Sequence, residues 1–303
     1  MPRPRACARL AWALTAIGIA ATPVRAVACA SCGCGDPTLT AVGVEKPYQN
    51  RLRIAVEERV GARSSGSDVA LARQLVLRSQ LGVSYSPHAR VTLVAVLPLV
   101  ASSVHGPAGR AARIVGLGDL DLQARVVVAR DRAFSPRHLF WLSAGLKTPT
   151  APRVRDDAGF PYPDDEQPGS GSWDPSAGAT YAWFGDLVSV STTLLYRHPT
   201  SGPRGYRFGP SLLSSTVAQL QPFTRVAFQL GADLRYAFAD EMANGAAAPS
   251  TGGLVAGVVP GLLVNPWRDL LLRAAVEVPV YQALRGAQSV GPQGVFTVSY
   301  DFL

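Results

Sequence analysis

Three cysteines lie close together near the N-terminus, in the stretch AVACASCGCGDP that begins at Ala26. Thiolates at such spacing bind soft ions such as Cu(I) or Zn(II). In an oxidising compartment two of them would instead form a disulfide. A metal site, a disulfide and no defined role stay open for Cys29, Cys32 and Cys34, and lipidation of Cys29 is a further alternative.

The segment 149–169 gathers a second set of candidate ligands. Its carboxylates are Asp156, Asp157, Asp164, Asp165 and Glu166. Clustered carboxylate oxygens of this kind suit Ca²⁺, although a solvated acidic surface would have the same composition. The segment is therefore a candidate Ca²⁺ site, and no other cofactor is expected apart from a soft metal at the cysteines.

Side chains for acid–base or nucleophilic catalysis are scattered. The four histidines are His88, His105, His138 and His198. The nearest approach to a Ser–His pair is Ser102 and Ser103 beside His105. No nucleophile motif surrounds these residues, and GLGDL at 116–120 is expected to begin a strand, whereas a phosphate-binding loop opens a helix. We therefore predict that the protein is not an enzyme.

A larger set of charged residues alternates with apolar residues along extended stretches. In GDLDLQARVVVA, for example, Leu122 and Val126 fall on one face and Gln123 on the other. Phe228 and Val276 belong to the apolar faces of two further stretches. Because side chains point alternately to the two sides of a β-strand, each stretch has one apolar and one polar face.

The length and spacing of these stretches predict an all-β fold, a transmembrane antiparallel up-and-down β-barrel. Many stretches run to 12 residues or more, whereas strands in soluble sheets usually have about five or six. Short connections alternate with longer ones, as periplasmic turns and outer loops do in outer-membrane barrels. A soluble β-sandwich shares the alternation but not this length. About twelve strands are expected, near 51–61, 73–85, 89–101, 116–130, 138–148, 170–183, 186–198, 205–219, 223–238, 251–264, 268–282 and 293–303.

In such a barrel the apolar faces meet lipid and the polar faces line the lumen. Aromatic anchors at the two membrane interfaces are expected at Trp173, Trp183 and Trp267. The lumen-lining candidates are Arg53, Glu57, Arg78, Asp119, Asp121, Arg125, Lys147, Asp233, Arg235, Arg273, Glu277 and Asp301. These charges either line a water path or pair across the lumen as structural ion pairs.

The N-terminus has the features of an export signal. Basic residues precede the apolar run 10–21, which is too short for a membrane helix, and Ala26 and Ala28 form a signal-peptidase pattern. We expect a signal peptide at 1–28, a periplasmic cysteine segment at 29–50 and a barrel at 51–303 in the bacterial outer membrane. The formal charge of +8 falls to about +4 when the four signal arginines leave, a surplus too modest to indicate nucleic-acid binding.

Three stretches carry a family resemblance. They are GLGDLDLQARVVV (116–128), LSAGLKTPTAP (142–152) and GSGSWDPSAGATYAW (169–183). Together they resemble the outer-membrane family named for the MetA pathway of phenol degradation, a group of transporters. The resemblance implies a barrel that passes small and often apolar compounds, and it supplies no catalytic residues. One departure is the C-terminus, because barrels commonly end on Phe, whereas here Phe302 is followed by Leu303.

Two classes of function follow from the sequence. One is a channel or transporter-like barrel for small solutes, hydrophobic ones included. The other is a non-conducting anchor or metal-handling component that works through its cysteine segment. In both cases the expected partners are outer-membrane lipid and the barrel assembly machinery, and the sequence leaves the small-molecule solute unknown.

Overall fold

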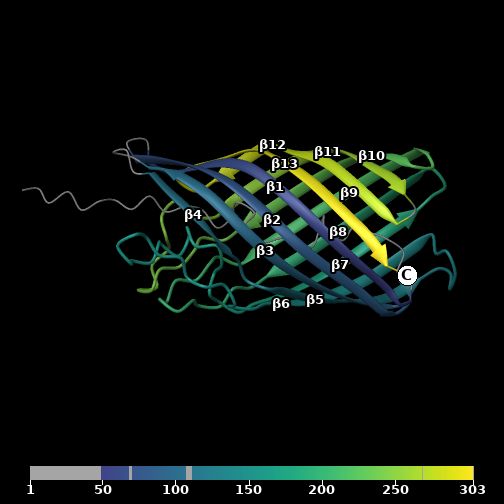
Figure 1. Cartoon of the computed structure of the whole chain (residues 1–303), viewed down its shortest axis with the longest axis horizontal. Helices are drawn as coiled ribbons and strands as arrows, with labels where there is room; N and C mark the ends of the chain where they lie inside the picture. The colour runs from purple at the N-terminus through teal and green to yellow at the C-terminus, as the bar shows by residue number, and fades with distance from the viewer. Residues whose placement is uncertain (1–48, 68–69, 107–110, 268, 303) are drawn as a thin grey trace, which may run out of the picture.

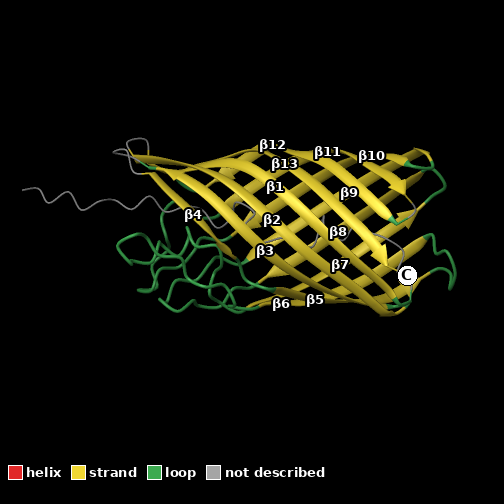
Figure 2. Ribbon diagram, in the orientation of Figure 1, coloured by secondary structure: helices red, strands yellow, loops and turns green. Residues whose placement is uncertain are grey.

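The computed structural model describes residues 49–67, 70–106, 111–267 and 269–302. The predicted signal peptide and all of the cysteines lie outside these ranges. Within them the protein is a closed antiparallel β-barrel without helices, as predicted (Figures 1 and 2). No helical segment of the described residues has the length and apolar character of a membrane span.

The described residues form thirteen strands in one sheet. They are β1 (Arg51–Ser67), β2 (Ala70–His88), β3 (Val91–His105), β4 (Ala111–Leu117), β5 (Asp121–Arg130), β6 (His138–Lys147), β7 (Asp174–Phe184), β8 (Val188–Arg197), β9 (Ser211–Phe223), β10 (Val226–Ala237), β11 (Gly253–Trp267), β12 (Leu270–Leu284) and β13 (Ala287–Phe302). Each strand pairs with its chain neighbours except that β4 and β5 both pair with β3, and β1 pairs with β13 to close the sheet.

Two of the thirteen strands share one position in the wall. β4 pairs with the half of β3 that ends at His105, and β5 pairs with the half that begins at Val91. They therefore act as one interrupted strand, and the barrel has twelve strands in cross-section, the predicted number. The prediction of one continuous strand near 116–130 is wrong, because the chain leaves the sheet at residues 118–120.

Other strand boundaries also differ from the prediction. Residues 62–72 and 283–292 were expected as outer loops, yet most of them continue β1, β2 and β13 in the sheet. Their small and polar residues suggest loops, but ladder hydrogen bonds to neighbouring strands hold them extended. Conversely, residues 170–173 and 205–210 were expected in strands and belong to loops.

The predicted faces are confirmed. Leu122, Val126, Phe228 and Val276 are all more than two-fifths exposed on the outside of the barrel. Their chain neighbours point inward and are buried, for example Gln123 and Ala275. Trp173 precedes β7, Trp183 lies near its other end and Trp267 ends β11, so exposed indole rings stand at the ends of the lipid-facing zone.

The two ends of the barrel differ in their connections. Asn50, before β1, and Phe302, the end of β13, lie at the end with short turns, which we assign to the periplasm. At the outer end three long loops, 148–173, 198–210 and 238–252, follow β6, β8 and β10. Figure 1 shows these loops gathered on one side, while the strands from β11 round to β4 extend further outward.

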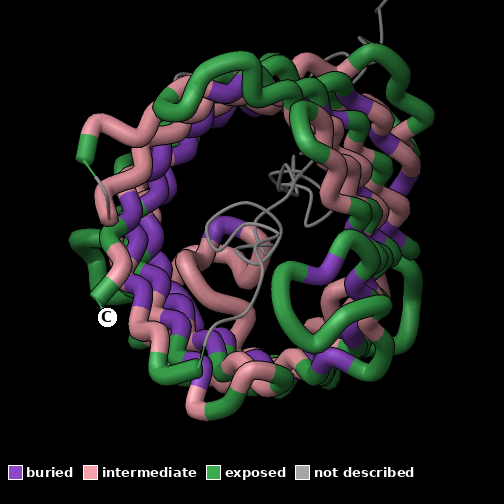
Figure 3. Tube along the Cα trace, turned by 90° about the vertical axis from the view of Figure 1, so that its right-hand side faces the viewer, coloured by how far each residue is buried: buried purple, intermediate pink, exposed green. Residues whose placement is uncertain are grey.

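Some loop chain lies inside the ring of strands, as Figure 3 shows in the view along the barrel. The interrupted strand makes room for this packing. A side chain on Gly118 would come within 2.7 Å of Pro98 Cγ, and one on Gly169 would collide with Ala151 and Asp119. Glycine at these two positions therefore allows loop 148–173 to approach the strand break closely.

Candidate functional site: the barrel lumen

A row of polar side chains, here called the polar layer, lies on the inner wall of the adjacent strands β2, β1, β13 and β12. Glu57 is fully buried and accepts hydrogen bonds from Arg59 Nε at 2.6 Å and from Thr297 Oγ1 at 3.1 Å. In the sheet register Glu57 stands opposite both Gln80 and Thr297, and Thr297 stands opposite Arg273. Two cavities of the lumen share no lining residue, and the polar layer contributes Thr297 and Arg273 to one of them and Arg59 to the other.

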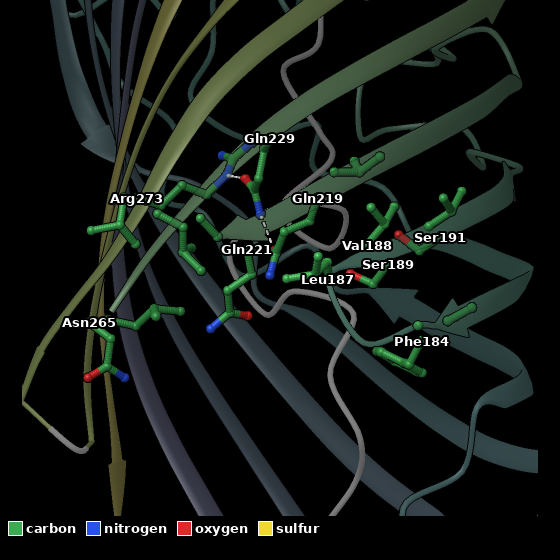
Figure 4. Close-up of a pocket in the computed structure, with 18 of the residues that line it drawn as sticks. Phe184, Leu187, Val188, Ser189, Ser191, Gln219, Gln221, Gln229, Asn265 and Arg273 are labelled. Carbon is green, nitrogen blue, oxygen red and sulfur yellow. Dashed lines mark hydrogen bonds between the residues drawn. The ribbon is translucent and has the colours of Figure 1, made fainter. Parts of the chain in front are cut away.

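The periplasmic half holds the larger cavity, of about 460 Å³, here called the lower cavity. Arg53 and Arg273, two predicted lumen residues, both line it. Arg53 forms two hydrogen bonds to Asp301, at 2.6 and 2.7 Å, and Arg51 bonds the same carboxylate at 2.5 Å. Arg273 donates from Nε to Gln229 Oε1 at 2.8 Å, as Figure 4 shows.

The outer half holds a smaller cavity, of about 160 Å³, here called the upper cavity. Arg78, Lys147 and Arg235 line it from the strands, and residues 165–170 line it from loop 148–173. Lys147 forms an ion pair with Asp174 at the outer start of β7. The loop therefore forms part of the lumen wall, which the sequence did not predict.

Asp119 attaches this loop to the strand break. It is almost fully buried and accepts hydrogen bonds from the backbone N–H groups of Ala151 at 3.0 Å and Ser170 at 2.6 Å. Ser170 Oγ also donates to it at 3.0 Å, and the Gly171 N–H at 3.3 Å. A carboxylate with several N–H donors is a strong anchor. Asp119 thus lies in the lining of the upper cavity, where it holds a loop and does not belong to a strand face.

The other predicted charges mostly have partners inside the barrel. Asp121 on β5 accepts a 2.6 Å bond from Arg197 on β8, across two intervening strands. Arg125 donates to Gln123 Oε1 at 2.8 Å. Asp233 accepts a 2.5 Å bond from Ser215 Oγ. A small recess of about 20 Å³ is lined by Asp233, Arg235 and Glu277.

Sequence reasoning missed several lumen residues. Asp174 and Arg197 stand at inward positions of β7 and β8, close to the outer strand ends. The alternation of these strands could have identified both. The uncharged Ser215 and Gln219 also line the lower cavity, and so does Gln229, which the alternation of its strand places on the polar face.

The predicted Ca²⁺ ligands are spread across loop 148–173. Asp164 forms ion pairs with Arg153 and Arg204, and Asp156 caps the turn before Phe160. Among the described residues no group of three or more His, Cys, Asp or Glu side chains could hold a metal ion. The cysteines lie outside the described ranges, so their metal, disulfide and lipid alternatives stay predictions.

The histidines lie at the ends of strands. His138 Nδ1 and the Tyr181 hydroxyl are 2.8 Å apart, and His198 Nδ1 and the Tyr196 hydroxyl are 3.2 Å apart. Within the described chain no hydrogen bond joins His105 to Ser102 or Ser103. The side chains that sequence reasoning considered for catalysis are thus strand-end residues paired with tyrosines or lying apart.

One loop carboxylate outside the membrane zone is strongly buried. Asp240, in loop 238–252, accepts bonds from the Tyr206 hydroxyl at 2.6 Å and the Gly209 N–H at 2.8 Å. Burial raises the pKa of Asp240 above its ordinary value, and the two hydrogen bonds oppose that rise. Asp240 therefore joins loops 198–210 and 238–252 at the outer rim.

A closed antiparallel barrel with an apolar outer face, a polar lumen and aromatic rings at its strand ends is an outer-membrane barrel, and its location is the bacterial outer membrane. Its wall of exposed apolar side chains places it in contact with membrane lipid. The comparisons with known proteins concern this fold.

Comparison with solved structures finds the COG4313 outer membrane channel from Pseudomonas putida F1 at a TM-score of 0.68 and 15% identity, covering 88% of this chain and 100% of that chain. The transport unit of the autotransporter AIDA-I from Escherichia coli matches at 0.51 and 13%, covering 90% and 95%. The P. putida toluene transporter TodX matches at 0.41 and 12%, covering 84% and 90%.

At these identities the likeness shows the fold, which is that of outer-membrane channels and transport units. No protein-family model matches the chain, and no curated protein does. The resemblance to the MetA-pathway family therefore stays a prediction from the three sequence stretches.

Proposed function

We propose that this protein is a channel for small solutes, hydrophobic ones included. The observation that carries the proposal is the pair of cavities inside one closed wall, with the polar layer around Glu57 and Arg59 on the wall between them. The lower cavity combines hydroxyl and amide groups with apolar side chains such as Phe184 and Val188. Water can form hydrogen bonds with the hydroxyl and amide groups, and apolar solutes can pack against the apolar side chains.

A transport role is favoured over an enzymatic one. The inward charges are used mainly to pair with each other, as Asp121 does with Arg197 and Lys147 with Asp174. Such pairs hold a lumen open at low electrostatic cost without presenting a reactive group. We further propose that the barrel assembly machinery inserts the chain, with Phe302 near the end of β13 as its recognition residue.

Conductance of the purified full chain in a planar bilayer tests the channel. We expect discrete single-channel steps, with larger steps for Arg59→Ala because that change thins the polar layer. Arg132→Ala, in the exposed periplasmic turn 131–137, is the matched control and should leave the steps unchanged. Uptake of radiolabelled toluene by cells with and without the protein tests apolar solutes. A folded protein that passes neither ions nor toluene would contradict the proposal.

A further inference from the structure

Arg273 is a partly buried cation of the lower cavity with unused hydrogen-bonding capacity. Its Nε donates to Gln229, but its Nη1 is buried and has no hydrogen-bond partner among the described residues. A buried donor without an acceptor is energetically unfavourable. A hydrogen-bond acceptor that enters the lower cavity would therefore be stabilised at this atom.

Nearby carboxylates do not supply that acceptor. The charges of Glu57, Arg59 and Asp233 act on Arg273 through space. Glu57 is hydrogen-bonded to Arg59 and Thr297, however, and Asp233 accepts from Ser215. Within the described chain neither carboxylate forms an ion pair with Arg273. The guanidinium can therefore still form a bidentate pair with the carboxylate of a ligand.

A row of amides connects Arg273 with the periplasmic mouth. Gln229 Nε2 donates to Gln219 Oε1 at 3.0 Å, and Gln221 lies two residues further along β9, so it shares the inward face (Figure 4). The exposed Arg225, in the turn between β9 and β10, lines the same cavity. Cations thus stand at the mouth and at the deep end, with uncharged donors between them.

The opposite side of the lower cavity (Figure 4) combines apolar side chains with the hydroxyl groups of Ser189 and Ser191. In Figure 4, Phe184 and Val188 lie across from Arg273 and Gln229. Phe184 packs against the buried inner cluster of Val127, Leu139, Trp141 and Ala182. Phe184 and Ala182 bring part of this cluster into the lining of the lower cavity. The lower cavity therefore has an anion-binding end and an apolar patch across from it.

From this juxtaposition we propose that the lower cavity binds small organic carboxylates with an apolar body. The carboxylate lies on Arg273, within reach of the amides, and the body lies against Phe184 and Val188. A cavity of about 460 Å³ is within the size range of small-molecule sites. The proposal rests on the proposed channel function, since it names a solute class for the same lumen.

Calorimetric titration of the detergent-solubilised full chain with benzoate tests the site, with benzamide as a neutral compound of the same shape. We expect benzoate to bind about tenfold more tightly than benzamide, because only benzoate gains the charged hydrogen bonds. Arg273→Gln should remove that preference and Arg273→Lys should keep part of it, while Arg132→Gln in the turn should change nothing. Equal binding of the two compounds, or an unchanged preference in Arg273→Gln, would overturn the proposal.

Arg273→Gln could fail to assemble, which would appear as loss of heat-modifiable migration on gels. A second variant tests the site in that case. Gln229→Leu keeps the charge of Arg273 but removes the group that orients it, and it should weaken benzoate binding several-fold without affecting benzamide. Unchanged benzoate binding in this variant would also count against the site. If the protein binds benzoate but passes no solute, the channel proposal is wrong and the carboxylate site stands. If the protein conducts but does not prefer benzoate, the channel proposal stands and the carboxylate site is wrong.

Discussion

The two sides of the barrel form their outer rims in different ways. From β11 through β13 to β3 the strands have 15 to 19 residues, and tight connections such as 285–286 join them. From β5 to β10 they have 10 to 13 residues and carry the long loops. We call these the long-strand side and the loop side.

The difference lies in what satisfies the polar groups at the rim. On the long-strand side the hydrogen bonds between strands satisfy these groups almost as far as the turns, as where Ser67 of β1 pairs with Ala70 of β2. On the loop side carboxylates do so, with Asp119, Asp174 and Asp240 each holding loop donors. A ladder needs no particular side chain, whereas the loops depend on a few acidic residues. Mutations should therefore affect the two sides unequally at the rim and equally in the lipid zone.

The largest effect is expected where the two sides should behave alike. Val276→Arg on the long-strand side and Leu122→Arg on the loop side should each cost about 2–4 kcal/mol near the midplane, because both side chains face lipid. Ser191→Arg, directed into the lower cavity, is the control and should cost far less. Denaturant unfolding in lipid vesicles measures all three, and equal damage from Ser191→Arg would mean that the faces are wrongly assigned.

The next effect should appear only on the loop side. Hydrogen bonds to a charged group contribute about 1.5–3 kcal/mol each, so Asp119→Ala should release loop 148–173. We expect trypsin added from outside to cut at Arg153 or Arg155 in the variant while the barrel stays assembled. Gln288→Ala, at the tight turn of the long-strand side, should remain resistant. Resistance of Asp119→Ala would mean that other contacts anchor the loop.

A smaller effect is expected on the long-strand side, where the pairing of β12 with β13 is interrupted. The β12–β13 ladder ends at Glu277 and Gln293. Beyond it the Gln282 side-chain amide makes both bonds to the Val290 backbone, at 2.7 and 2.9 Å. Neutral hydrogen bonds contribute about 1 kcal/mol each, so Gln282→Leu should speed amide exchange at Val290 about tenfold. The exchange rate of the Val298 amide, within the continuous ladder, should not change. An unchanged exchange rate at Val290 would mean that groups other than Gln282 protect this part of the hairpin.

The smallest effect concerns pH. Burial raises the folded-state pKa of Asp240, so the folded loop binds this proton more tightly than the unfolded chain does. Stability of the Asp240 loops should therefore fall as the pH rises from 3.8 to the folded value, and acidification should restore it. Hydrogen exchange in residues 238–252, corrected for intrinsic rates, measures this, and Asp240→Asn should flatten the dependence. An opposite slope would mean that the hydrogen bonds from Tyr206 and Gly209 outweigh burial.

The sequence by itself determined the class of fold and most of its faces. Alternation with period two is set by strand geometry and does not depend on the partner strand. For this reason Leu122, Phe228 and Val276 could be assigned to lipid, and Arg53, Glu57 and Arg273 to the opposite face, before any pairing was known. The twelve positions of the wall followed from the same pattern.

Only the tertiary structure decided where strands end and which lumen groups meet. Ser64 to Ser67 suggest a loop, but pairing with β2 keeps them in a strand. GLGDL looks like a strand start, but loop 148–173 folds onto Asp119 and interrupts the strand there. Likewise no sequence pattern predicts that Arg197 meets Asp121, or that Arg273 Nη1 has no hydrogen-bond partner among the described residues. These contacts join residues far apart in the chain, and closure of the barrel, which no local pattern encodes, is what brings them together.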